Sequence, residues 1–328
     1  MKTGFMWLRI RLYLLVASMF TLLYGVIAGI GYLLGVTGLF FYIYLLGFAA
    51  ALVGVQYMVG PKAVEWSMRV RYVDESEYPR LHRMVSQLAD KAGIPKPRVG
   101  LSRVDVPNAF AFGKTKRDAR VCVTKGLLKL LTEEELKAVL GHEISHIKHR
   151  DVAVITMLSV IPMVCYMMYI SFLWGGMFSR GKRDSGILVL IGFVALVLYF
   201  LTSLLVMYGS RIREYYADVG SVKLGNHPSK LANALYKLVY GSMKADRDAL
   251  RKVAGLKAFF VNDVSRSIHE IRELRDIDLD MSGTIDEDEL RVLSQRRIRL
   301  SIGDRLMEML STHPNMVKRI KHLSSLEV

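Results

Sequence analysis

Cysteine is scarce in this chain of 328 residues, which contains only Cys122 and Cys165. Two thiols so far apart in the sequence cannot supply a thiolate cage for a structural metal ion. They also argue against a disulfide framework and are typical of a protein that meets a reducing compartment.

Charged residues are absent from three long stretches, residues 12–61, 152–179 and 185–210. A transmembrane helix needs roughly 20 apolar residues, so these stretches predict four spans, with the first stretch divided into about 12–34 and about 39–60. Buried core helices of a soluble protein are the alternative, but uncharged stretches of this length rarely occur there. An apolar content of 52% and a mean hydropathy of +0.27 agree with a mainly α membrane protein.

The first stretch also lacks a small-residue cleavage site and is too long for a signal peptide, so we expect it to be retained. Basic residues next to the four spans predict a multi-pass protein of the plasma (inner) membrane with its polar parts in the cytoplasm. Arg180, Lys182 and Arg183 between the last two spans leave open whether the second hairpin crosses fully.

The net charge of +15 has a simple explanation in these flanking basic residues, which attract anionic headgroups of the lipid bilayer. No basic patch with stacking aromatic residues and no known nucleic-acid module is present, so we expect no nucleic-acid partner.

The stretch from Leu131 to Asp151, LTEEELKAVLGHEISHIKHRD, predicts a helix that begins with a capping box at Thr132. His142 and His146 are four residues apart, so both imidazoles leave the same face of the helix and can share one metal ion. Glu143, rotated by about 100°, can reach a water bound to that ion. By itself this HExxH pattern of zinc peptidases also arises by chance.

A third metal ligand is available downstream, where SRIREYYAD predicts another helix. Glu214 and Asp218 are four residues apart and share one face of it. Two histidines and one glutamate, with a fourth position left to water, form the ligand set of one class of catalytic zinc site.

GHEISHIKHRD, followed after a hydrophobic hairpin by SRIREYYADVGSV, resembles the HtpX-type membrane zinc metalloproteases, which are relatives of the CAAX prenyl proteases. The resemblance implies an α+β cytoplasmic zincin-like peptidase domain with a small edge-strand sheet, and misfolded membrane proteins as polypeptide substrates. It implies zinc ligands His142, His146 and Glu214, with Glu143 as general base and Asp218 orienting a ligand histidine. The expected parts are a membrane hairpin at 1–61, peptidase segments at 62–151 and 211–328, and a second hairpin at 152–210.

Residues 76–92 show a helical period, and residues 98–104 and 119–124 predict short strands. Between these strands, Asn108 and Ala109 resemble the family's substrate-binding edge strand, which pairs with an extended peptide. The alternative is an ordinary hairpin strand with Phe110 and Phe112 in the core. Near the C-terminus, the segment around His313 resembles a family element whose histidine is proposed to lie near the substrate carbonyl. The alternative is that His313 caps a helix or serves only in packing.

An acidic segment departs from the family pattern. Residues 278–289, DLDMSGTIDEDE, follow the twelve-residue EF-hand loop, with Gly283 at the turn and Ile285 at the apolar eighth position. The segment predicts a calcium site within an insertion at about 264–296. An isolated loop can be weak and structural, can pair between two molecules in a homo-oligomer, or can regulate access to the zinc site. The predicted calcium ligands are Asp278, Asp280, Ser282, Thr284, Asp286 and Glu289.

Together these features predict a zinc-dependent membrane endopeptidase modulated by calcium. The alternatives are a CAAX-type prenyl-peptide protease, for which four spans look too few, and a non-catalytic calcium sensor or scaffold that retains a zinc site.

Overall fold

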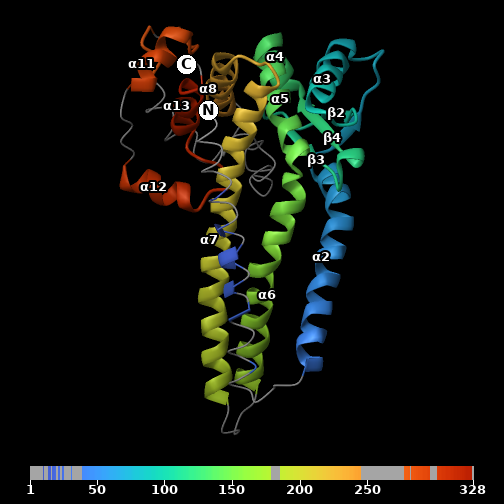
Figure 1. The fold of residues 1–328 in the computed structure, drawn as a ribbon, viewed down its shortest axis with the longest axis vertical. Coiled ribbons are helices and arrows are strands. Elements are labelled where there is room, and N and C mark those ends of the chain that lie inside the picture. Colours follow the sequence, from blue (N-terminus) through green and yellow to red (C-terminus); the bar gives the residue numbers. More distant parts are fainter. Residues whose placement is uncertain are drawn as a thin grey trace. The chain divides into compact units, whose positions relative to one another are not determined.

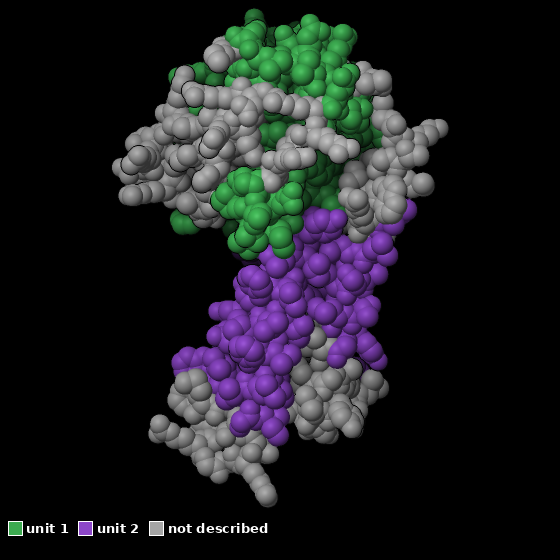
Figure 2. Space-filling view, turned by 90° about the vertical axis from the view of Figure 1, so that its left-hand side faces the viewer, with its two compact units in different colours: residues 1, 60–152, 210–328 green, residues 2–59, 153–209 purple. Residues whose placement is uncertain are grey.

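The computed structural model describes residues 39–178, 185–244, 277–280, 282–295 and 301–326, together with scattered positions between residues 10 and 31. The chain, drawn as a ribbon in Figure 1, divides into two compact units, which Figure 2 shows in different colours. The first unit comprises residues 60–152 and 210–328 with Met1, and the second comprises residues 2–59 and 153–209.

A four-stranded sheet lies in the first unit, with strand order β1-β2-β4-β3 (Figure 1). β2 pairs in parallel with β4, whereas β1 and β3 pair antiparallel with their neighbours, so the sheet is mixed. The small sheet predicted from the sequence is therefore confirmed. The strands are β1 (Val70–Tyr72), β2 (Arg98–Ser102), β3 (Ala109–Phe112) and β4 (Arg120–Thr124).

The HExxH segment forms helix α5 (Glu133–His149). The predicted capping box is present, because the Thr132 side chain accepts from the Glu135 N–H and the Glu135 carboxylate accepts from the Thr132 N–H. The helix ends at Arg150, which adopts a left-handed conformation with φ 57°. This turn separates α5 from the next helix. The two histidines lie near the C-terminal end of α5.

Two helices of the described part are long and apolar enough to cross a membrane, over Asp151–Trp174 and Gly186–Lys223. They belong to α6 (Asp151–Phe178) and α7 (Ser185–Lys223). Tyr166 of α6 packs on Tyr199 of α7, with ring centroids 5.3 Å apart. The second predicted span falls on α2 (Leu39–Ser67), but most of the first lies outside the described residues. The four-span topology therefore stays a prediction.

Shorter helices complete the first unit. α8 packs against both α5 and the last helix, and their buried aliphatic side chains form one hydrophobic core with α3 and the sheet. The helical periodicity of Ile268, Ile271 and Leu274 predicts a helix before the acidic loop, but these residues lie outside the described part of the chain. The shorter helices are α3 (Pro79–Ala92), the 3-10 turn η1 (Lys116–Asp118), α4 (Lys125–Leu130), α8 (Pro228–Lys244), α11 (Glu287–Gln295), α12 (Ile302–Met309) and α13 (Met316–Ser324).

Helices α5 and α7 approach each other closely at two levels. A Cβ atom added to Gly220 of α7 would lie 2.6 Å from the Cβ of Ser145 on α5, which is closer than real side chains come. The hydroxyl of the next residue, Ser221, donates to the carbonyl of Ala138, about two turns before Ser145 on α5, over 2.6 Å. Only glycine at position 220 permits this separation, so a small residue sets how near the Glu214 segment comes to the HExxH helix.

We expect Gly220→Ala to destabilise the protein by about 1–3 kcal/mol, because the methyl group overpacks the contact with Ser145. Ser145→Gly, which costs about 1 kcal/mol in a helix by itself, should recover part of this loss in the double variant. Denaturant unfolding of the four proteins in detergent measures the coupling. Additive effects of the two substitutions would show that this contact does not set the helix separation.

Candidate metal centre

His142 and His146 direct their Nε2 atoms toward the same point, and the two nitrogens lie 3.1 Å apart. The His142 side chain is 1% exposed and that of His146 is 17% exposed. The i, i+4 spacing places the rings edge to face, with centroids 4.6 Å apart. Two imidazole nitrogens this close in a nearly dry site are suited to share one cation.

Glu214 of α7 brings a carboxylate to the same point. One of its oxygens lies 3.5 Å from His142 Nε2 and the other lies 3.5 Å from His146 Nε2. Ligands around a tetrahedral zinc ion lie about 3.3 Å apart, given metal–nitrogen distances of about 2.0–2.1 Å. The three separations therefore suit a single small divalent ion, and the donor set of two imidazoles and one carboxylate suits zinc.

Asp218, one turn after Glu214, lies 2.9 Å from Nδ1 of His142. The geometry suits a carboxylate that fixes the ring and its tautomer, as such partners usually do. A fully buried guanidinium, Arg319 of α13, holds both acids of α7, at 2.6 Å from Asp218 and 3.0 Å from Glu214. Arg319 did not emerge from the sequence, where its only signal is its position six residues after His313.

His146 has a corresponding partner in Asp151, whose Oδ2 lies 2.6 Å from the ring Nδ1. The other oxygen of Asp151 is held by Arg213, which also donates to the His149 carbonyl over 3.3 Å. Sequence reasoning missed this pair as well. The turn at Arg150 places Asp151, at the first position of α6, beside the ring of His146, and such a turn is hard to read from residues alone.

Burial and polar neighbours shift the pKa values of the two imidazoles in opposite directions. Burial favours a neutral His142, but hydrogen bonds to Asp218 and Glu214 raise its pKa to about 9. Burial and the neighbouring charge of His142 lower the pKa of His146 to about 4. For Arg319, burial alone would lower the pKa, and the charges of Asp218 and Glu214 raise it above its ordinary value. Near neutral pH these shifts favour a positively charged His142 beside a neutral His146.

The buried charges of this site call for a cation. Four carboxylates exceed two guanidinium groups by two negative charges, and unbalanced buried charge is costly. A divalent ion in place of the His142 proton brings the total to zero. The acids are Glu143, Asp151, Glu214 and Asp218, and the bases are Arg213 and Arg319, all no more than 6% exposed.

Glu143 is 5% exposed, and its charge acts on His146. No hydrogen bond or ion pair to its carboxylate occurs in the described part of the chain. A buried carboxylate without such a partner would cost free energy if it were only structural. The observation favours a group that meets a water or a substrate.

The predicted substrate strand is at the edge of the sheet. β3 pairs with β4 on one side, with Ala109 opposite Val123, and no other described strand borders it. The Asn108 carbonyl accepts from the Thr124 N–H over 2.9 Å, so Asn108 faces β4 with its backbone. In an antiparallel ladder successive residues alternate in direction, and the N–H and C=O of Ala109 therefore face the open edge of the sheet. β3 packs on α5.

His313 also belongs to the site. It is 6% exposed, and its Nδ1 lies 3.4 Å from Glu214 Oε1. The structure thus brings this histidine to the carboxylate of the predicted third ligand.

The acidic loop contains a separate cluster of carboxylates. Carboxylate oxygens of Asp278, Asp280 and Glu289 lie within 4.8 Å of one another. Asp278 and Glu289 are each 6% exposed, and the buried Asp278 Oδ1 has no hydrogen-bond partner in the described part. Ser282, Thr284 and Asp286 lie in the same loop, where Ser282 Oγ contacts Thr284 Oγ1 at 2.9 Å.

Two helix-borne histidines and a carboxylate from a second helix form a donor set that suits the metal site of a metallopeptidase. The model of peptidase family M48 matches residues 75–327, and this chain belongs to that family. It is 52% identical to a protease HtpX homolog of Methanothermobacter thermautotrophicus, over 71% of this chain and 86% of that protein. It is 35% identical to a protease HtpX homolog 2 of Methanosarcina acetivorans, over 87% of this chain and 85% of that protein. The chain is therefore an HtpX-type membrane metallopeptidase.

The fold is also similar to the crystal structure of S. mikatae Ste24p, with a TM-score of 0.50. Sequence identity is 17%, and the match covers 95% of this chain and 63% of that one. This likeness concerns the fold alone.

We expect Asp151→Asn to weaken zinc binding about 10- to 100-fold, because the amide no longer fixes the His146 ring. Asp90→Asn, an exposed position on α3, serves as the control. Competition with a chromogenic chelator gives both affinities, on protein shown to unfold cooperatively. Equal zinc affinity in the two variants would exclude an orienting role for Asp151.

Proposed function

We propose that the chain is a zinc-dependent endopeptidase, with zinc held by His142, His146 and Glu214. The observation that carries this proposal is the convergence of three ligand atoms, from helices far apart in the sequence, at separations suited to one tetrahedral ion. Asp218 orients His142.

A bound zinc ion supplies Lewis acidity and lowers the pKa of a water to about 7. Glu143 is the general base, takes the proton of the attacking water and passes it to the leaving amine. Because no other described group holds its carboxylate, Glu143 is free to make this transfer. His313 donates to the oxygen of the substrate carbonyl as negative charge develops there.

An extended substrate adds to the open edge of β3 as a further strand. Main-chain hydrogen bonds to Ala109 align the peptide with little dependence on its sequence. Asn108, the preceding residue, contributes to binding the same part of the peptide. Such binding suits an enzyme that cuts many polypeptides.

The substrates are cytoplasmic segments of membrane proteins, chiefly misfolded ones, and the active site faces the cytoplasm from the plasma (inner) membrane. The basic residues beside the four predicted spans support this orientation. The 52% identity to a protease HtpX homolog favours an HtpX-type protease over a CAAX-type prenyl-peptide protease.

Glu143→Gln tests the proposal. We expect peptidase activity on casein, and self-cleavage, to fall by about 10²–10⁴-fold, because the amide cannot take the proton. Zinc content should stay at one ion per chain, since the three ligands are untouched. Glu133→Gln, an exposed position at the start of the same helix, is the matched control and should retain activity. Unchanged activity of Glu143→Gln would favour a scaffold that keeps its zinc.

We also propose that the acidic loop binds calcium and modulates the enzyme. The proposed ligands are Asp278, Asp280, Ser282, Thr284, Asp286 and Glu289, at the loop positions that supply oxygen. The observation in favour is the buried oxygen of Asp278, which lies among other carboxylates without a hydrogen-bond donor.

A hydrogen-bonded path connects this loop to the zinc helix. The Ile285 N–H donates to the Asn233 side-chain carbonyl of α8 over 3.1 Å. The amide of Asn233 donates to Glu135, the residue that closes the capping box of α5. Lys237 of α8 binds the same carboxylate at 2.8 Å. Ordering of the loop would therefore stabilise the N-terminus of α5, the helix that carries His142 and His146.

We expect calcium to raise peptidase activity about fivefold at fixed zinc, the size of a modest coupling between sites. Glu289→Gln should lose this response, whereas Asp288→Asn, an exposed neighbour, should keep it. Asn233→Ala should still bind calcium by calorimetry but lose most of the activation. Equal activity of wild type and Glu289→Gln across a calcium titration would remove the modulation from the proposal.

A further inference from the structure

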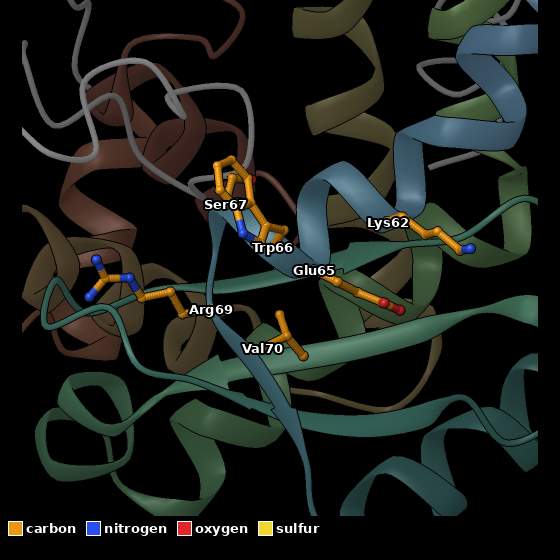
Figure 3. Close-up of a pocket in the computed structure, with 6 residues that line it drawn as sticks. All are labelled: Lys62, Glu65, Trp66, Ser67, Arg69 and Val70. Atoms are coloured by element: carbon orange, nitrogen blue, oxygen red, sulfur yellow. The ribbon is translucent and has the colours of Figure 1, made fainter.

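A hollow of about 780 Å³ lies where α2 ends and β1 begins (Figure 3). It is outside the metal centre and outside the acidic loop. Its walls combine basic, aromatic and apolar side chains, and Trp66 and Arg69 stand at different sides of the helix end in Figure 3. The lining residues are Lys62, Glu65, Trp66, Ser67, Arg69 and Val70.

A second hollow, of about 540 Å³, shares Arg69 and Val70 with the first. Its other walls are Arg71 and Arg103, so three of its four lining residues are arginines and none is acidic. Arg71 is paired with Glu77 at 2.9 Å, but no described acid pairs with Arg69 or Arg103. Two guanidinium groups therefore face this hollow without a protein counter-charge.

The one acid of the larger hollow is already engaged. Glu65 forms an ion pair with Arg120 at 3.0 Å and accepts a hydrogen bond from Tyr72. It therefore does not neutralise Lys62 or Arg69. Both hollows keep an uncompensated positive charge, which favours an anionic ligand.

Arg69 is held in a strained conformation. Its φ is 48°, in the left-handed region that residues other than glycine rarely adopt. The Arg103 N–H donates to the Arg69 carbonyl over 3.4 Å, and the Ser102 hydroxyl donates to the preceding Met68 carbonyl over 2.6 Å. Strain that neighbouring groups maintain is characteristic of binding sites. Figure 3 shows the Arg69 side chain pointing away from the end of α2, and it lines the second hollow together with Arg103.

The surroundings indicate the kind of anion. α2 carries no charged residue from Leu39 to Gly60, and Trp66, which follows in the same helix, is 86% exposed. An exposed tryptophan just beyond an apolar helix is typical of the level of lipid headgroups. We infer that Arg69 and Arg103 bind the phosphate of an anionic phospholipid headgroup, beside which Trp66 anchors. This inference rests on the proposed position of α2 in the membrane.

Trp66 supplies the measurement. In full-length protein carrying Trp7→Phe and Trp174→Phe, Trp66 is the only tryptophan. We expect phosphatidylglycerol brominated on its acyl chains to quench Trp66 in nanodiscs at about a tenfold lower mole fraction than brominated phosphatidylcholine. Loss of both arginines in Arg69→Gln/Arg103→Gln should remove most of this preference, since each basic residue near the surface contributes about fivefold.

The matched control is Arg80→Gln/Arg83→Gln, which removes two exposed charges from α3 and should keep the lipid preference. Equal quenching by the two lipids would overturn the headgroup site while leaving α2 in the membrane, and no quenching by either would overturn both. Displacement of the brominated phosphatidylglycerol by millimolar inorganic phosphate would assign the hollow to free phosphate instead. Peptidase activity is not the readout, so failure of the zinc proposal would leave these results unaffected.

Discussion

The separation of α5 and α7 is the constraint on which the metal centre depends. Gly220 leaves room for Ser145, and Ser221 hydrogen-bonds to the backbone of α5 about two turns before Ser145. Because the helices touch at this level, Glu214, less than two turns from Gly220, reaches the two imidazoles. If the two helices were further apart, the side chains of His142, His146 and Glu214 could not meet at one point.

Buried ion pairs hold the carboxylates of the site in position after helix packing has brought them together. Removing carboxylates and guanidinium groups from water is expensive, and a buried pair offsets this cost only when its geometry is good. Arg319 meets this condition by contacting both Asp218 and Glu214. Arg213 does the same for Asp151, which in turn contacts His146. Each imidazole thus has a carboxylate at its back, and each of these carboxylates has a buried guanidinium, so the rings cannot turn away from the centre.

Local patterns in the sequence were enough to predict much of this arrangement. The capping box at Thr132 follows from residues three positions apart, and the shared face of His142 and His146 follows from helix geometry. The short strands were also readable, with β2 ending at Ser102 rather than continuing to residue 104. Arg319 and Asp151 were not readable as partners of the site. Their roles depend on a helix far along the chain and on a left-handed turn at Arg150, and neither leaves a periodic signal.

The order of these parts along the chain has a consequence for biosynthesis. The histidines are translated first, Glu214 follows only after the second hairpin, and Arg319 comes with α13 near the C-terminus. A nascent chain that still lacks its last helix has no buried base to hold the two acids of α7. The ion pairs that hold Asp218 and Glu214 therefore form only after α13 has been translated.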